Sequence, residues 1–528
     1  MGNLSNKLTE GLGETTHSTT ESYPLVTNSP SDLKVLSKTT TSPPQTEVTN
    51  SQTHNKLVKI NQVIKSSLKN GKVNPSTIAK FITTKYNFIL DEETGILWMY
   101  NSKEGIYTSK SKIVIDKEIK NLLKNQCRAR YSQDVEYNIR TTVPTGIMDT
   151  EKPELLAVQN GVLNIITKEL KEFSPDFHIT NKLPWKYDPV IKAEEWLKFL
   201  DSLELTPTEL QQLKEIVGHC LYKAIITETI TALIGKGSNG KSIFLKIIEK
   251  FFTKKNRSNI TLQQLGADKF AIYDLNNIYA IICFDLPKEA IHDTGNIKAV
   301  VSGDGLPGNK KHVQGSFNVN LFCKIIASGN YLPQVTSEED SDAWHRRFLI
   351  IQMKKKFRGK NKIPRQELLS KLGTETEMTG ILNWALEGFD TLYKNSEITD
   401  KPDVEEAKKA YRIASSTVAA YFDNESQITD SSENWIDKKV CYRNYVAYCH
   451  KIDLPILSYS EFCKEVTKVV KGIYETRIRP DPNNRDLKIP VYQYVLFCPV
   501  EHKCKDCHLF DKCHRGEKYD TTIAGDRT

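Results

Sequence analysis

The stretch that decides the fold reads Gly235-Lys236-Gly237-Ser238-Asn239-Gly240-Lys241-Ser242, a complete loop of the GxxxxGK[ST] form. The residues from Thr229 to Ile234 are apolar or β-branched and predict a buried strand. Behind the loop, apolar residues recur at helical spacing between Ile243 and Phe252. In a strand, loop and helix of this kind the glycines let backbone N–H groups approach phosphates, and the helix N-terminus adds a favourable dipole. The sequence therefore predicts a nucleoside triphosphate site, with Lys241 on the phosphates and Ser242 on Mg²⁺.

Two later apolar runs end in polar residues that fit the same site. The first covers residues 278–284 and ends at Asp285, and the second covers residues 321–329 and ends at Asn330. An acid at the end of a neighbouring strand holds Mg²⁺ and polarises the attacking water, and an amide near the γ-phosphate orients that water. We expect both side chains beside the phosphate loop.

A turn-rich segment between these two runs carries the next candidate. Gly305, Pro307, Gly308 and Asn309 mark a tight turn. The residues after the turn that we expect to contact DNA phosphates are Lys310, Lys311 and His312. A solvated, charged turn is the alternative interpretation.

Two arginines, Arg346 and Arg347, precede the last apolar run of this region. Arginine supplied by a neighbouring subunit can neutralise the charge that develops during phosphoryl transfer. The alternative is a structural ion pair with Asp340 or Asp342.

These elements, in this order, resemble the superfamily 3 helicases, an AAA+ group, and most of all their phage, plasmid and poxvirus primase–helicase branch. Asp285-Leu286-Pro287, Gly303-Asp304 and Arg346-Arg347 each match a motif of that branch, and residues 158–163 with 173–176 resemble its upstream segment. The resemblance implies an AAA+ nucleotide core of α/β class, ATP and Mg²⁺ as cofactors, and a ring, expected to be a hexamer. It also implies movement on single-stranded DNA driven by a hairpin carrying Lys311 and His312.

The chain departs from that pattern in two ways. Leu286 stands where many members have a second acid, so the base that activates the water is open, with Glu289 as one candidate. The globular part upstream is also too short for a primase domain, so we expect a separate primase or polymerase as a partner.

Composition separates the chain into segments. Its 528 residues, with 39% hydrophobic and 26% charged residues and a net charge of +8, fit a soluble protein of several domains with a polyanionic partner. No apolar run could cross a bilayer and no signal peptide opens the chain, so we expect no membrane contact and a cytoplasmic or host-nucleoid location. The expected domains are a disordered Ser/Thr-rich tail (1–55), a mostly α N-terminal domain (56–190), the helicase domain (191–375), a helical linker (376–429), a winged-helix domain (430–497) and a Cys-rich tail (498–528).

The last two domains carry further expectations. The winged helix resembles the module that often ends this family, and its basic surface would bind duplex DNA; a packing module is the alternative. The tail places Cys498, Cys504, Cys507 and Cys513 close together, a cluster that in a reducing compartment favours zinc. Disulfides, an iron–sulfur cluster or no site are the alternatives.

Together these features predict an ATP-dependent replicative DNA helicase of a virus, plasmid or integrated element. Two other functions fit less of the sequence. One is a non-enzymatic origin-binding or scaffold protein with a vestigial nucleotide site, and the other is a DNA-packaging or RNA-remodelling motor.

Overall fold

A computed structural model provides the structure of the chain. It describes residues 47–69, 74–287, 290–309, 316–319, 321–335, 341–357, 363–428, 434–452, 454–470, 472–478, 488–493 and 495–497. The chain divides into two units, Met1–His54 and Asn55–Thr528. Every element below belongs to the second unit except the start of the first helix. The first helix begins at Glu47, inside the segment that we expected to be disordered.

The N-terminal module combines helices with two sheets. Its helices are α1 (Glu47–Lys69), α2 (Pro75–Lys85), α3 (Ser111–Leu123) and α4 (Ala129–Arg140), with 3-10 turns at Lys124–Gln126 and Pro175–Phe177. Its strands are β1 (Phe88–Asp91), β2 (Leu97–Asn101), β3 (Ile106–Thr108), β4 (Thr145–Gly146), β5 (Leu155–Val158), β6 (Gly161–Asn164) and β7 (Leu170–Lys171). They form sheets of order β3-β2-β1-β4 and β5-β6-β7. Helices hold more residues of this module than strands do, and the domain that we expected to be mostly α also contains two sheets, because short strands such as β1 and β4 pair across long stretches of chain and leave little local signal.

A parallel five-stranded sheet forms the centre of the next module. Its strands are β8 (Ile230–Ile234), β9 (Arg257–Ser258), β10 (Ala280–Cys283), β13 (Lys324–Gly329) and β14 (Phe348–Gln352), in the order β14-β8-β13-β10-β9. Every neighbouring pair in this sheet is parallel. The expected α/β class is therefore confirmed.

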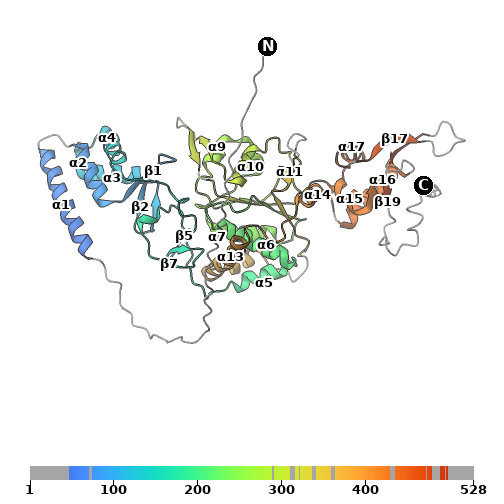
Figure 1. Ribbon diagram of the computed structural model, residues 1–528, viewed down its shortest axis with the longest axis horizontal. Helices are drawn as coiled ribbons and strands as arrows, with labels where there is room; N and C mark the ends of the chain where they lie inside the picture. Colours follow the sequence, from blue (N-terminus) through green and yellow to red (C-terminus); the bar gives the residue numbers. More distant parts are fainter. Residues whose placement is uncertain are drawn as a thin grey trace, which may run out of the picture. The chain divides into compact units, whose positions relative to one another are not determined.

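Helices cover both faces of this sheet (Figure 1). They are α5 (Glu194–Ser202), α6 (Pro207–Cys220), α7 (Lys241–Phe252), α8 (Leu262–Ala267), α9 (Lys269–Tyr273), α10 (Gly295–Ser302), α11 (Asp342–His345), α12 (Arg365–Leu372) and α13 (Glu375–Asn395). Side chains alternate between the faces of a strand. Leu233 accordingly joins the apolar core around α6, α7 and α13, whereas Ala232 and Ile234 join the core around α8 and α10.

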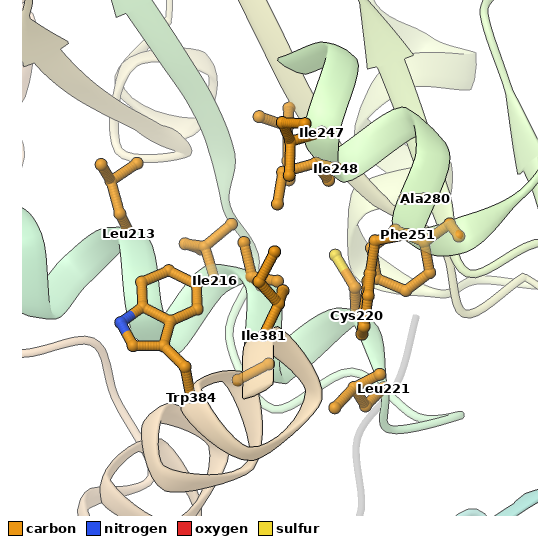
Figure 2. Packing of buried hydrophobic residues seen from close by; sticks show 14 of the residues in the cluster. Leu213, Ile216, Cys220, Leu221, Ile247, Ile248, Phe251, Ala280, Ile381 and Trp384 are labelled. Atoms are coloured by element: carbon orange, nitrogen blue, oxygen red, sulfur yellow. The ribbon is translucent and has the colours of Figure 1, made fainter. Parts of the chain in front are cut away.

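Helix α13 belongs to this module, although we expected its residues to form a linker. A Cβ on Gly218 of α6 would lie 2.3 Å from the Ala385 carbonyl oxygen, and a Cβ on Gly388 of α13 would lie 2.2 Å from the Lys214 carbonyl oxygen. The two helix backbones therefore touch, and apolar residues of both fill the layer around the crossing (Figure 2). The apolar face of α13 packs against the rest of the nucleotide module, so α13 is part of this module and not a linker.

The C-terminal module includes residues 430–497, which we expected to form a winged helix, and combines helices with short strands. Its elements are α14 (Val404–Ser415), α15 (Thr417–Glu425), β15 (Ser426–Ile428), β16 (Trp435–Asp437), α16 (Lys438–Ile452), α17 (Tyr459–Val469), β17 (Tyr474–Ile478), β18 (Ile489–Gln493) and β19 (Val495–Phe497). Strands β16, β18 and β17 form one antiparallel sheet. Ser458 caps α17 in a reciprocal capping box with Glu461. The exposed basic side chains of the module include Lys464, Lys468, Arg477 and Lys488.

Several predictions lie outside the described residues. They concern Glu289, the loop residues Lys310, Lys311 and His312, and the tail cysteines Cys498, Cys504, Cys507 and Cys513. Of the seven cysteines elsewhere, Cys220, Cys283, Cys323, Cys441 and Cys449 are buried, Cys463 is half-buried and Cys127 is exposed. Among the described helices, none is both long and apolar enough to span a bilayer.

Candidate nucleotide-binding site

The loop from Gly235 to Ser242 connects β8 to α7, as the sequence predicted. Gly240 caps α7 in the left-handed region with φ 89°, and a Cβ there would lie 2.4 Å from Leu203 Cδ2. A Cβ on Gly235 would lie 2.4 Å from the Met353 carbonyl oxygen. Both positions therefore require glycine for the loop to keep its conformation. A loop of this form can direct backbone N–H groups toward a bound phosphate.

Polar side chains of the loop bond within it. The Lys241 ammonium is buried, bonds to the carbonyl oxygen of Gly235, and donates to Asn239 Oδ1 at 3.0 Å. Asn239 Nδ2 in turn donates to the Met353 carbonyl oxygen at 2.9 Å, which ties the loop to the end of β14. Burial lowers the pKa of Lys241 to about 8, and the Asp285 carboxylate opposes this shift. The ammonium is thus held at the centre of the loop.

Asp285 and Asn330 lie at the same edge of the sheet as this loop. The Gly235 N–H donates to the carbonyl oxygen of Gly329, the residue before Asn330, at 3.2 Å. On the next strand, the Leu286 N–H donates to the carbonyl oxygen of Ser328 at 2.9 Å, which places Asp285 level with the end of β13. Because the carboxyl ends of parallel strands share one edge, the structure brings the predicted acid and amide beside the loop.

The donor set at this edge fits a magnesium nucleotide. Ser242, Asp285 and Asn330 are exposed and supply a hydroxyl, a carboxylate and an amide. Mg²⁺ prefers oxygen ligands and usually takes only one or two from the protein. Among the described residues, no group of three or more His, Cys, Asp or Glu side chains is placed to hold a metal.

Leu286, which replaces the second acid of the resembled motif, is only 4% exposed and packs in the apolar core around α8 and α10. Its Cβ lies 3.1 Å from the Cβ position built on Gly329. The side chain therefore points away from the loop, and this position contributes no base.

Arg346 and Arg347 lie at the opposite, amino edge of the sheet. They join α11 to β14, and Phe348 at the start of β14 pairs with Ile230 at the start of β8. The phosphate loop begins beyond the other end of β8, so arginine and loop are roughly 20 Å apart at about 3.3 Å per residue. The structure does not bring these arginines to the loop of their own chain.

Glu228 pairs with both arginines, whereas the alternative interpretation of the sequence named Asp340 or Asp342 as the partner. Its Oε2 lies 2.6 Å from Arg347 Nη2 and 3.8 Å from Arg346 Nη2. Asp342 pairs with Lys408 instead, and Asp340 lies outside the described residues. Nothing in the sequence around Glu228 indicates that it pairs with the arginines, because Arg346 and Arg347 come just before a different strand, β14.

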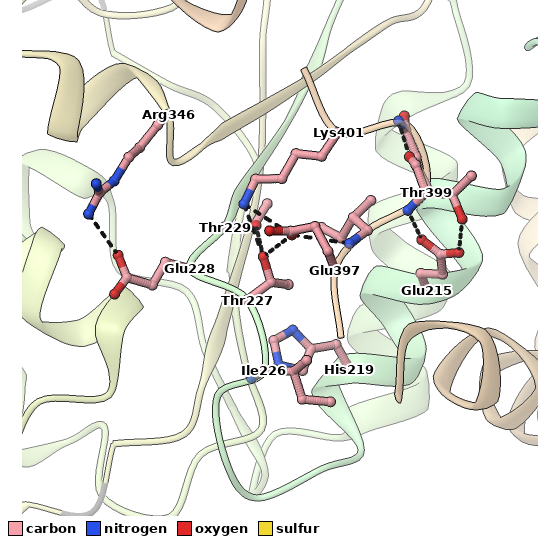
Figure 3. Close-up of polar contacts among 12 residues, drawn as sticks. Glu215, His219, Ile226, Thr227, Glu228, Thr229, Arg346, Glu397, Thr399 and Lys401 are labelled. Atoms are coloured by element: carbon pink, nitrogen blue, oxygen red, sulfur yellow. Dashed lines mark hydrogen bonds and ion pairs between the residues drawn. The ribbon is translucent and has the colours of Figure 1, made fainter. Parts of the chain in front are cut away.

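The segment between α13 and α14 fixes the chain on either side of Glu228 (Figure 3). Thr227 Oγ1 donates to Glu397 Oε1 at 2.5 Å and accepts from Lys401 Nζ at 3.0 Å. Thr227 and Thr229 are buried on this side. Since strand side chains alternate, Glu228 points the other way, toward the arginines.

Two strands bracket the predicted DNA-contacting loop. β11 (Leu306–Asn309) and β12 (Ser316–Val319) form an antiparallel pair that starts at Leu306 opposite Val319. The strands confirm the expected hairpin, and its tip, with Lys310 to His312, lies outside the described residues.

The fold and the loop define an α/β protein with a loop of the phosphate-binding form. Residues 75–203 match the family model described as "D5 N terminal like", and residues 233–347 match a "Family of unknown function (DUF5906)". The second match runs from the strand before the phosphate loop to the arginine pair, so it covers both edges of the sheet.

A protein of Acanthamoeba polyphaga mimivirus, described as "Putative helicase L207/L206", is 23% identical over 224 residues. The alignment covers 39% of this chain and 22% of that relative. Solved structures of the NrS-1 C terminal region align with 80% of this chain and 100% of theirs, at 14% identity with a TM-score of 0.43 and at 13% identity with a TM-score of 0.41.

Proposed function

We propose that this protein is an ATP-dependent DNA helicase that works in the replication of viral or related mobile DNA. The observation that carries the proposal is the division of the candidate site between the two edges of one sheet. The phosphate loop, Asp285 and Asn330 lie at the carboxyl edge, and Arg346 lies at the amino edge, too far away to complete the same site. A closed ring resolves this division because each subunit completes its neighbour's site.

Each residue then has a chemical role. Lys241 and the loop N–H groups hold the phosphates, and Ser242 and Asp285 hold Mg²⁺, which supplies charge neutralisation during phosphoryl transfer. Asn330 orients the attacking water. Arg346 of a neighbouring subunit stabilises the charge that develops on the γ-phosphoryl group.

DNA contacts complete the proposed motor. The β11–β12 hairpin would bring Lys310, Lys311 and His312 to single-stranded DNA in the channel of an AAA+ ring, expected to be a hexamer. The exposed basic residues of the C-terminal module, as part of a proposed winged helix, would contact duplex DNA. The cysteine tail would hold zinc, and a separate primase or polymerase would work beside the ring at a cytoplasmic or nucleoid replication site. The name of the mimivirus relative supports the helicase assignment.

An ATPase assay with and without single-stranded DNA tests the proposal. We expect hydrolysis that requires Mg²⁺ and rises when single-stranded DNA is added, together with unwinding of a forked duplex. Binding of duplex DNA without hydrolysis would favour an origin-binding scaffold instead. Stimulation by RNA or by blunt duplex DNA alone would favour an RNA-remodelling or packaging motor.

A further inference from the structure

The two adjacent arginines have opposite surroundings. The Arg346 side chain is 54% exposed and stands 3.8 Å from Glu228. The Arg347 side chain is only 8% exposed and stands 2.6 Å from the same carboxylate. A residue that must reach into a neighbouring subunit needs to be accessible, and only Arg346 is. Arg347 must therefore act within its own chain.

Arg347 bonds to three different elements. Its Nη1 donates to the Ala343 carbonyl oxygen of α11 at 2.5 Å, and its Nη2 donates to Ser302 Oγ of α10 at 3.0 Å. The same Nη2 pairs with Glu228, just before β8. In addition, the Arg347 carbonyl oxygen accepts from the Ile230 N–H at 2.6 Å. Its planar guanidinium can hold several acceptors in fixed directions, which a lysine cannot do.

Ser302 lies just before the first hairpin strand, β11. It is the last residue of α10, and Gly303 after it adopts the left-handed conformation with φ 74°. A Cβ on Gly303 would lie 2.8 Å from Ile225 Cγ1, and the Asp304 N–H donates back to the Ala299 carbonyl oxygen at 2.9 Å. The chain therefore leaves α10 in one fixed direction and enters β11 at Leu306.

We propose that Arg347 is a positioning residue that couples Arg346 to the DNA-contacting hairpin through Ser302. The inference rests on the proposed helicase function and adds to it a route between nucleotide and DNA. When Arg346 moves toward a neighbour's nucleotide, the backbone that it shares with Arg347 moves with it. The bond from Arg347 to Ser302 passes this displacement to the end of α10 and so to β11. DNA bound at the hairpin acts along the same contacts in reverse.

The test compares two serines that each end a helix and are half-buried. Ser302→Ala removes the hydroxyl that accepts from Arg347. Ser415→Ala is the matched control, because Ser415 ends α14 and its hydroxyl bonds only to the Arg412 carbonyl oxygen of its own helix, at 3.1 Å. For each full-length variant we would measure ATP hydrolysis without DNA, hydrolysis with saturating single-stranded DNA, and the Kd for that DNA.

We expect Ser302→Ala to lower the stimulation of hydrolysis by DNA about fivefold to tenfold, as the loss of a charge-assisted hydrogen bond implies. DNA-free hydrolysis and the Kd for DNA should match those of Ser415→Ala. Arg347→Lys, which keeps the charge but not the fork, should lose stimulation as well.

Equal stimulation in Ser302→Ala and Ser415→Ala would overturn the coupling role while leaving the helicase proposal standing. A wild-type protein whose hydrolysis ignores DNA would overturn both. The two failures are thus distinguishable in one set of assays.

Discussion

The two edges of the central sheet differ in how they are built. At the carboxyl edge the groups that would touch a nucleotide come from three neighbouring strands, β8, β13 and β10, within one chain. At the amino edge Arg346 is exposed, and its neighbour Arg347 contacts both Glu228 and Ser302. In the proposed function the first edge would receive the nucleotide, whereas the second edge is connected to the hairpin through Ser302. In the proposed ring, the sheet of one subunit therefore contributes to two different nucleotide sites, one at each edge.

The strongest test of this comparison mixes two inactive variants. Lys241→Ala damages the carboxyl edge and Arg346→Ala damages the amino edge, and each should lower kcat about a thousandfold. In a mixed ring, a subunit with intact Lys241 can face a neighbour with intact Arg346. We expect mixing to restore a fraction of the ATPase rate.

Recovery should depend on the mixing ratio and peak near equal amounts. A mixture that is no more active than its parts would show that both residues serve one chain's site, contrary to the geometry above.

A second test asks whether the acid of the resembled motif could return at position 286. Leu286→Glu would bury an unpaired carboxylate in the core around α8 and α10, at a cost of about 3 kcal/mol in the free energy of unfolding. It should not raise the ATPase rate. Denaturant unfolding measures the cost, with Leu286→Met as the control that keeps the packing. A faster enzyme of normal stability would place position 286 in the site.

The third test concerns the layer beneath the sheet. Gly388→Ala would force a methyl group against the Lys214 carbonyl oxygen and should lower the free energy of unfolding by about 2 kcal/mol. Gly237→Ala is the control, because a Cβ there meets no atom within 4 Å. Thermal unfolding of the two variants should separate them clearly, and equal midpoints would contradict the close crossing of α6 and α13.

The smallest expected effect is a pH dependence confined to the carboxyl edge. Burial lowers the pKa of Lys241 to about 8, so its ammonium is charged below that pH and becomes neutral as pH rises through it. Because phosphates favour the charged form, ATP binding should weaken about tenfold between pH 7 and pH 9 and should take up a proton near pH 8. Calorimetry in buffers of different ionisation enthalpy measures this uptake, and Lys241→Arg should remove it.

The carboxyl edge was largely predictable from sequence, because each of its groups follows an apolar run in a local motif. Glycine positions, Lys241, Asp285 and Asn330 all lie where the pattern put them. The burial of Leu286 was not predictable, since it depends on the packing of β10 beside β13.

The amino edge was predictable only in part. The sequence marked Arg346 and Arg347 but not their partner, because Glu228 lies before a different strand and pairs only once β8 and β14 align. The role of α13 was missed for a related reason: an amphipathic helix shows an apolar stripe without showing what covers it.

The crossing of α6 and α13 has a mechanical consequence. Where two backbones touch at Gly218 and Gly388, no side chains lie between them whose rotamers could change to let one helix slide along the other. We therefore expect α6 and α13 to move together as one rigid body. A conformational change driven by nucleotide binding would then move the elements on the opposite face of the sheet, namely α10 and the hairpin.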